Sequence, residues 1–251
     1  MGSSTRPTRW TELAPTPAGC GGSRRDAGTL VSPMPGTDLF QGMESPIGRR
    51  GRCEWATMRV VEPTSASIDD VRGEMLARRR ALAADVVARS SAVVVERLRG
   101  LPEVREAQTI GAYLGVRGEV DPSALYDDEG LDVALPVTTP GEPLRFVVPA
   151  GPLLDGPFGI RQPGDGREVA PDDLDLVLIP VVAADEIGNR VGHGAGFYDR
   201  TFARDQRADP ARPLLIGLCH AFQVVPRLEA RSWDVPLDLV VTEVGLVRPG
   251  M

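Results

Sequence analysis

The chain has 251 residues, of which 42% are apolar and 25% are charged, and its formal net charge is −7. This apolar content is sufficient for a packed core, while the acidic balance excludes the basic surface on which nucleic-acid binding depends. We therefore expect a globular protein without nucleic-acid partners.

The apolar runs and the cysteines bear on the cellular compartment. No run approaches the roughly 18 apolar residues of a membrane helix, and the longest, 177–184, is broken by Pro180. Cys20, Cys53 and Cys219 have no paired spacing, which counts against a disulfide framework and against a zinc site. We expect a cytoplasmic protein without membrane contact; the oligomeric state is left open, with a monomer as our expectation.

Residues 1–66 differ in composition from the rest of the chain. They are rich in Pro, Gly and Arg and lack a sustained apolar period, which is typical of disorder. A transit peptide would explain the Arg and Ser content, but six acidic residues count against it. A start assigned too early, with Met58 as the true first residue, is the simpler hypothesis. We expect a disordered extension over 1–66 and one domain over 67–248.

From Ser67 onward the pattern predicts ordered elements. Ser67 can cap a helix, and apolar residues at helical spacing continue to Arg99, so one long or two consecutive helices are predicted. Strands are predicted at 109–114, 133–135, 144–148, 176–179, 214–218 and 239–241. Helical or loop stretches separate most of them. This alternation indicates a mostly parallel sheet with helices on both faces, a Rossmann-like three-layer α/β domain.

A glycine-spaced loop follows the strand at 176–179. Gly192, Gly194 and Gly196 permit positive φ and a close ligand approach, and the N–H groups that open the next helix attract anions. Asp199 lies within a turn of that anion site, where a carboxylate would repel phosphate unless a divalent cation bridged the two. Because the chain contains no Lys, Arg190 is the candidate phosphate ligand.

Each of these residues also has a structural explanation. Many turns use glycine without binding a ligand, and neither the Walker pattern nor the dinucleotide fingerprint is present. Arg190 could close the turn after Asp185 at the surface. Both alternatives stay open on the residues alone.

Ligands of parallel sheets bind beyond the carboxyl ends of the strands, and three polar segments fall there, at 117–121, 185–199 and 232–238. Glu119 could face a cleft, and the structural alternative is an acid that accepts backbone donors at a helix start. Asp234 and Asp238 surround Pro236, so either could cap or turn the chain.

Taken together, the segments resemble those of the 5-formyltetrahydrofolate cyclo-ligase family, also called 5,10-methenyltetrahydrofolate synthetase. The resemblance covers about 68–247 and follows the family's order through VRGEMLARRRAL, AYLGVRGEVDPSAL, DVALPV, GPFGIRQP, DLVLIPVVAADEIGNRVGHGAGFYDRTF and SWDVPLDLVVTE. The combination of NRVGHGAGFYDR with DVPLD is the most specific part.

The resemblance implies an ATP-dependent and Mg²⁺-dependent conversion of 5-formyltetrahydrofolate to 5,10-methenyltetrahydrofolate, with ATP as co-substrate. Such a ligase binds small molecules and must mainly position them and neutralise phosphate charge. Two alternatives remain. One is a catalytically weak or inactive folate- or nucleotide-binding relative, and the other is an ATP-dependent phosphotransferase acting on another small acceptor.

The resemblance also assigns site residues. Catalytic roles fall to Arg190 and Asp199, and the metal positions are Asp199 and Asp234. The ATP-binding positions are Arg72, Arg190, Val191, Gly192, His193, Gly194, Ala195, Gly196, Phe197 and Tyr198. The folate-binding positions are Leu114, Glu119, Phe158, Gly194, Gly196 and Phe197.

Two positions depart from the family pattern. Many members carry a Lys four residues before the equivalent of Arg72, and here that position is Ile68. Loss of this charge would weaken ATP binding unless an Arg at 78–80 replaced it. His193, between two loop glycines, could contact phosphate or serve as a solvent-facing spacer.

Overall fold

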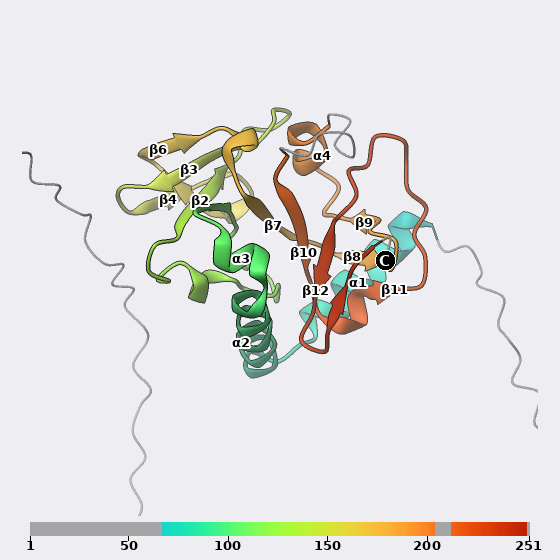
Figure 1. Ribbon diagram of the computed structural model, residues 1–251. Coiled ribbons are helices and arrows are strands. Elements are labelled where there is room, and N and C mark those ends of the chain that lie inside the picture. Colours follow the sequence, from blue (N-terminus) through green and yellow to red (C-terminus); the bar gives the residue numbers. More distant parts are fainter. Residues whose placement is uncertain (1–66, 204–211, 250–251) are drawn as a thin grey trace, which may run out of the picture. The chain divides into compact units, whose positions relative to one another are not determined.

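The computed structural model describes residues 67–203 and 212–249, so the extension predicted over 1–66 lies outside the described residues. The described residues fall within one compact unit that mixes helices and strands (Figure 1). The helices are α1 (Ile68–Arg80), α2 (Ala84–Gly100), α3 (Pro102–Glu106) and α4 (Phe197–Thr201).

The first helical region is two helices rather than one. Ser67 and Asp70 form a capping box at the start of α1, as the sequence predicted for Ser67. Three arginines occupy the last turn of α1, where their positive charges interact favourably with the negative end of the helix dipole. Helix α2 ends at Gly100, just before Pro102 opens α3, because the residue preceding a proline disfavours helical backbone.

The main sheet has eight strands in the order β13-β12-β10-β7-β1-β2-β3-β6. Their bounds are β1 (Thr109–Gly111), β2 (Asp132–Val137), β3 (Arg145–Pro149), β6 (Gly166–Val169), β7 (Leu176–Pro180), β10 (Leu214–Leu218), β12 (Leu239–Val241) and β13 (Leu246–Val247). The five neighbours β12, β10, β7, β1 and β2 are parallel to one another. Strands β13 and β3 each pair antiparallel with the neighbour nearer the centre, and β6 pairs antiparallel with β3. The predicted, mostly parallel sheet is thus confirmed at its centre, while its edges are mixed.

Residues of the central strands alternate between two cores. In β7, Leu176 and Leu178 join the core cluster that includes Val94 and Leu98 of α2. The alternate residues of β7, such as Val177, join the opposite cluster. This near-continuous apolar composition reflects burial on both faces, which is usual for parallel strands. The second cluster also contains Phe202, Val235 and Leu237. Side chains of α4 pack against it.

Two smaller sheets were not predicted. Strands β11 (Val224–Val225), β8 (Ala183–Asp185) and β9 (Arg190–Val191) form a three-stranded sheet, and β4 (Leu153–Asp155) pairs with β5 (Arg161–Pro163). Helix α1 lies beside β8 and β11 in Figure 1, and Met75 packs there with Val182, Val191 and Leu228. Strands this short carry almost no periodic signal in the sequence.

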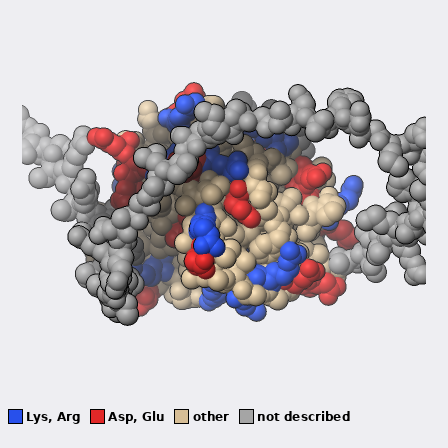
Figure 2. Space-filling model, turned by 90° about the horizontal axis from the view of Figure 1, so that it is seen from below, with Lys and Arg blue, Asp and Glu red and all other residues tan. Residues whose placement is uncertain are grey.

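Charge is mixed on the surface. Figure 2 shows one face, on which the arginines and the acidic side chains lie close to one another rather than in separate patches. Among the described residues, none of the helices combines the length and the apolar character needed to cross a bilayer.

Candidate functional site

A pocket of about 650 Å³ lies beyond the carboxyl ends of the parallel strands β1, β2 and β7. Leu114, Pro136 and Pro180, at or just past those ends, line it, as expected for an open parallel sheet. Every residue predicted for the site also lines this pocket: Arg72, Leu114, Glu119, Phe158, Arg190, Val191, Gly192, His193, Gly194, Ala195, Gly196, Phe197, Tyr198, Asp199 and Asp234. Positions more than 150 residues apart in the sequence therefore meet in one cavity.

The glycine loop runs from β9 to α4 and has the predicted conformation at two of its three glycines. Gly194 has φ of 94° and Gly196 has φ of 66°. The prediction is wrong for Gly192, which is not among the residues with positive φ. A side-chain Cβ at Gly192 would meet no atom within 4 Å, so the space beside it is open. At this position the absence of a side chain keeps the backbone accessible rather than permitting a turn.

Arg72 of α1 contacts the glycine loop and also lines the pocket. Its Nε donates to the carbonyl oxygen of Gly192 at 2.9 Å, and its Nη1 pairs with Asp69 one turn earlier. Ile68 also lines the pocket. The sequence hypothesis that an arginine at 78–80 replaces the missing Lys is not supported, since the residues lining the pocket include none of these three.

Arg190 and Asp199 form an ion pair in the pocket wall. Arg190 Nη2 donates to Asp199 Oδ1 at 2.6 Å, and the Arg190 side chain is 6% exposed. The alternative in which Arg190 closes a turn at the surface is therefore wrong. Asp185 closes that turn without it, by accepting bonds from the backbone N–H groups of Ile187 and Asn189.

The residue that follows Asp234, Val235, contacts this pair through its backbone. The N–H of Val235 donates to Asp199 Oδ1 at 3.2 Å. Asp234 Oδ2 itself accepts the N–H of Arg231 at 2.8 Å, so Asp234 also closes a turn, as one of the alternatives held. Asp238 is structural, because it binds Arg212 and the N–H of Leu215 at the start of β10.

Within the described residues, no group of three or more His, Cys, Asp or Glu side chains could hold a metal by itself. Mg²⁺ does not require such a group, since it commonly uses one or two carboxylates together with water and substrate phosphates. Asp199 Oδ2 and Asp234 Oδ1 accept no hydrogen bond from the described residues, so each carboxylate keeps one oxygen for a cation.

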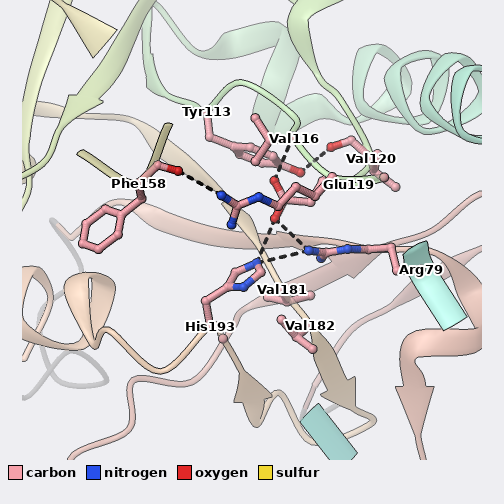
Figure 3. A network of polar contacts seen from close by, with 12 residues as sticks. Arg79, Tyr113, Val116, Glu119, Val120, Phe158, Val181, Val182 and His193 are labelled. Carbon is pink, nitrogen blue, oxygen red and sulfur yellow. Dashed lines mark hydrogen bonds and ion pairs between the residues drawn. The ribbon is translucent and has the colours of Figure 1, made fainter. Parts of the chain in front are cut away.

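Glu119 belongs to a buried network with Arg79 and His193 (Figure 3). Its Oε1 lies 3.2 Å from Arg79 Nη2 and 3.0 Å from His193 Nε2, and these two nitrogens are 3.1 Å apart. The other oxygen of Glu119 accepts the N–H of Val116 at 3.1 Å. The predicted backbone interaction is thus present, but Glu119 also faces the pocket. His193 is more than a solvent-facing spacer, since its ring contacts the Glu119 carboxylate; its role as a phosphate contact stays a prediction.

Apolar side chains line the opposite wall. The rings of Phe158 and Phe197 meet edge to face with centroids 6.0 Å apart. Phe158 is 53% exposed and has φ of 64°, which is unusual for a residue with a side chain. Arg117 donates to its carbonyl oxygen at 3.0 Å. Phe158 is therefore an exposed pocket residue and not part of the core.

Two tyrosines lie close to Glu119. Burial raises the pKa of Tyr113 and of Tyr198, and the negative charge of Glu119 raises both further. Tyr113 donates its hydroxyl to the carbonyl oxygen of Val120 at 2.6 Å. Both phenols stay protonated at neutral pH, so they can donate hydrogen bonds but cannot act as bases in the resting site.

Several pocket residues were missed by sequence reasoning. Arg231 and Trp233 lie within three residues of Asp234, so the SWDVPLD segment offered a signal for them. Arg161 and Gln162 belong to β5, which no pattern predicted. Arg79, which contacts Glu119 without lining the pocket, was named only together with Arg78 and Arg80, because the sequence does not distinguish these three consecutive arginines.

Comparison with known proteins shows the family. Residues 64–243 match the model of the 5-formyltetrahydrofolate cyclo-ligase family. The chain therefore belongs to this family. A 5-formyltetrahydrofolate cyclo-ligase of Escherichia coli is 34% identical over 174 residues, which cover 66% of this chain and 94% of that protein. One from Haemophilus influenzae is 35% identical over 159 residues, covering 59% and 83%.

Solved structures of family members resemble the fold as well. The 5,10-methenyltetrahydrofolate synthetase of Aquifex aeolicus superposes with a TM-score of 0.64 at 32% identity, covering 73% of this chain and 93% of that one. A synthetase from Mycoplasma pneumoniae has a TM-score of 0.55 at 22% identity, covering 70% and 98%. The second likeness shows the fold alone. The chain therefore has the mixed α/β fold of the cyclo-ligase family.

Proposed function

We propose that this chain catalyses the ATP-dependent conversion of 5-formyltetrahydrofolate to 5,10-methenyltetrahydrofolate, with release of ADP and phosphate. The observation that carries the proposal is that a single pocket contains the glycine loop, the acids Asp199 and Asp234 and the separate carboxylate Glu119. Membership of the cyclo-ligase family supports the same activity. A phosphotransferase acting on another acceptor would not require Glu119 in this pocket.

The nucleotide side of the proposed site is the stretch from Arg190 to Tyr198 together with Arg72. Guanidinium groups and loop N–H groups bind phosphate oxygens, and the open space beside Gly192 supports a close approach there. Asp199 pairs with Arg190 and balances its charge. An arriving phosphate would compete with that carboxylate for the guanidinium.

Mg²⁺ fits the free carboxylate oxygens of Asp199 and Asp234. When bound, Mg²⁺ neutralises phosphate charge and aligns the phosphates for transfer. The two catalytic candidates would then have separate roles. Asp199 would bind the cation, and Arg190, no longer paired with Asp199, would bind phosphate directly.

The folate side of the proposed site consists of Leu114, Glu119, Phe158, Phe197 and the backbone at Gly194 and Gly196. The Phe158 and Phe197 rings offer an apolar wall for a flat heterocycle. A carboxylate such as Glu119 can accept hydrogen bonds from the N–H groups of a pterin. Substrate and nucleotide would then meet at the glycine loop.

The chemistry of the family reaction requires positioning above all. The formyl oxygen of 5-formyltetrahydrofolate takes the γ-phosphoryl group, and the bond between that phosphorus and ADP breaks. N10 of the substrate then attacks the activated carbon and loses its proton, phosphate leaves, and the five-membered ring closes. Because the nucleophile belongs to the substrate, no Ser, Cys or Lys nucleophile is required of the protein.

The remaining expectations also belong to this proposal. We take the domain as 67–248, with the Rossmann-like arrangement of three layers and helices on both faces. The buried free thiol of Cys219 supports a reducing compartment and hence the cytoplasm. We also propose a monomer, which is the expectation drawn from the sequence.

The test is product formation, followed by the near-ultraviolet absorbance of the methenyl product. The protein is mixed with 5-formyltetrahydrofolate, ATP and Mg²⁺, and each component is then omitted in turn. Product that requires all components establishes the activity. If no product forms while folate or ATP binding is measurable by calorimetry, the chain is a binding relative or acts on a different acceptor instead.

A further inference from the structure

We propose that Arg79 is a positioning residue: from behind the pocket wall, its buried guanidinium fixes the carboxylate of Glu119 for folate binding. This inference rests on the proposed function, because it takes Glu119 as a folate contact. Glu119 lines the pocket and Arg79 does not, so Arg79 can influence a ligand only through the pocket residues that it contacts, Glu119 and His193.

The carboxylate is held at both oxygens. Arg79 Nη2 reaches Oε1 at 3.2 Å, and the N–H of Val116 reaches Oε2 at 3.1 Å. The side chain of Arg79 is 1% exposed and that of Glu119 is 6% exposed. Water therefore cannot replace either bond readily, and the carboxylate cannot rotate without breaking one of them.

The backbone is also shaped for this contact. Arg117 has φ of 53° and Gly118 has φ of 80°, so two consecutive residues are in the left-handed region just before Glu119. A Cβ at Gly118 would lie 2.9 Å from the carbonyl oxygen of Arg79. His220 donates from Nε2 to the carbonyl oxygen of Gly118 at 2.9 Å and secures the loop from the other side. Only glycine at 118 lets this loop approach α1 so closely.

Stability does not explain the arrangement. Arg79 Nε and Nη1 are buried without a hydrogen-bond partner among the described residues. Burial lowers the pKa of Arg79, and the charge of Glu119 only partly opposes that effect. A well-packed apolar pair in place of such a buried ion pair is commonly neutral or stabilising. A costly charge held against a pocket-facing carboxylate indicates a role at the site.

The glycine loop contacts the same carboxylate oxygen through His193, whose side chain is 41% exposed and lines the pocket. Arg79 differs from His193 in being almost fully buried and in lying outside the pocket lining. We therefore assign the orientation of Glu119 to Arg79, and regard His193 as a contact that the ligand can displace.

The test combines Arg79→Met, Arg79→Lys, Glu119→Gln and the double variant Arg79→Met/Glu119→Gln. Arg89→Met is the matched control, because Arg89 also pairs with an acid, Asp85 at 2.7 Å, but on the exposed face of α2. The KM for 5-formyltetrahydrofolate and the KM for ATP are measured separately for each protein. Unfolding in denaturant gives the stability of each protein independently.

Arg79→Met should raise the KM for the folate about 10-fold to 100-fold, the usual range for a residue that supports a ligand contact. The KM for ATP should stay unchanged, and Arg79→Lys should lose less because it keeps a charge. The double variant should have the same folate KM as Glu119→Gln alone, since Arg79 acts through Glu119. Arg89→Met should match the wild type.

Three results would overturn the inference. The first is an unchanged folate KM in folded Arg79→Met, and the second is an equal rise in its KM for ATP. The third is a double variant whose folate KM rises by the product of the two single-variant effects. If Arg79→Met does not fold, Arg79→Lys and the double variant decide, because neither leaves an unpaired Glu119 carboxylate. If the wild type makes no product, the proposed function fails, and calorimetric folate affinities of the same variants still test the inference. A wild type that does not bind folate overturns both.

Discussion

At the scale of single residues, the pair of Arg190 and Asp199 is the feature most closely tied to the proposed chemistry. A nearly buried guanidinium with one carboxylate partner is stable only while that partner, or a phosphate, remains. Within this pair, the charge of Arg190 is balanced by that of Asp199. Binding of nucleotide and cation would exchange these partners rather than create new unpaired charges.

Asp199→Asn is expected to abolish product formation while folate binding stays measurable, because an amide oxygen is a poor cation ligand and leaves Arg190 without its partner. Absorbance of the product and calorimetry with the folate test the two parts. The loss of the partly buried pair also costs up to roughly 3 to 5 kcal/mol of stability, so folding is checked by denaturant. Asp127→Asn, at an exposed position outside the pocket, is the control. Full activity of Asp199→Asn would refute the cation assignment.

The departure at Ile68 allows a gain-of-function experiment. Ile68 is half-buried at the pocket, four residues before Arg72. Ile68→Lys adds a charge-assisted contact of roughly 1.5 to 3 kcal/mol, so the KM for ATP should fall about 10-fold to 100-fold. Ile68→Met, which has similar volume and no charge, should leave that KM unchanged. An equal effect of both substitutions would mean that packing, not phosphate binding, is responsible.

At the scale of elements, α1 supports both sides of the pocket. Arg72 and Arg79 are seven residues apart and so lie on one face of the helix, with Met75 between them facing the small sheet. Arg72 binds the glycine loop, and Arg79 binds Glu119. The capping box at Ser67 and the packing of Met75 thus have consequences for the site, because they place this face of α1.

Substitutions in the glycine loop can distinguish a glycine required for backbone conformation from one required for ligand access. Gly194→Ala must adopt φ of 94°, which should cost about 1 to 2 kcal/mol of stability. Gly192→Ala meets no atom within 4 Å and should keep wild-type stability, yet it should weaken ATP binding if phosphate approaches its backbone. Denaturant unfolding and calorimetric ATP titration measure the two effects. If Gly192→Ala binds ATP normally, the phosphates lie elsewhere.

At the scale of the whole molecule, the fold raises the pKa of all three tyrosines of the chain. Burial raises the pKa of Tyr113, Tyr126 and Tyr198, and nearby acids raise each further. The unfolded chain releases these protons near pH 10, whereas the folded protein retains them. Stability is therefore complete below about pH 10 and falls as the pH rises from there toward the folded pKa values.

The alkaline loss should amount to about 1.4 kcal/mol per pH unit for each tyrosine. Tyrosinate absorbance should appear only as the protein unfolds, and it should appear near pH 10 in a control titration in denaturant. Circular dichroism recorded alongside gives the unfolding transition. Tyrosine ionisation near pH 10 in a protein that is still folded would contradict the burial of these side chains.

The sequence by itself determined the central strands and the start of α1, because apolar periodicity and capping are local signals. The predicted site residues that line the pocket came mainly from the resemblance to the cyclo-ligase family, and other lining residues, such as Arg161 and Trp233, were missed. The tertiary structure alone decided the mixed edges of the sheet and the pairing of Arg190 with Asp199. It also decided the contact of Arg79 with Glu119, 40 residues apart in the chain. In the sequence, Arg79 is indistinguishable from its neighbours Arg78 and Arg80; only the packing of α1 against the small sheet turns one of the three toward Glu119.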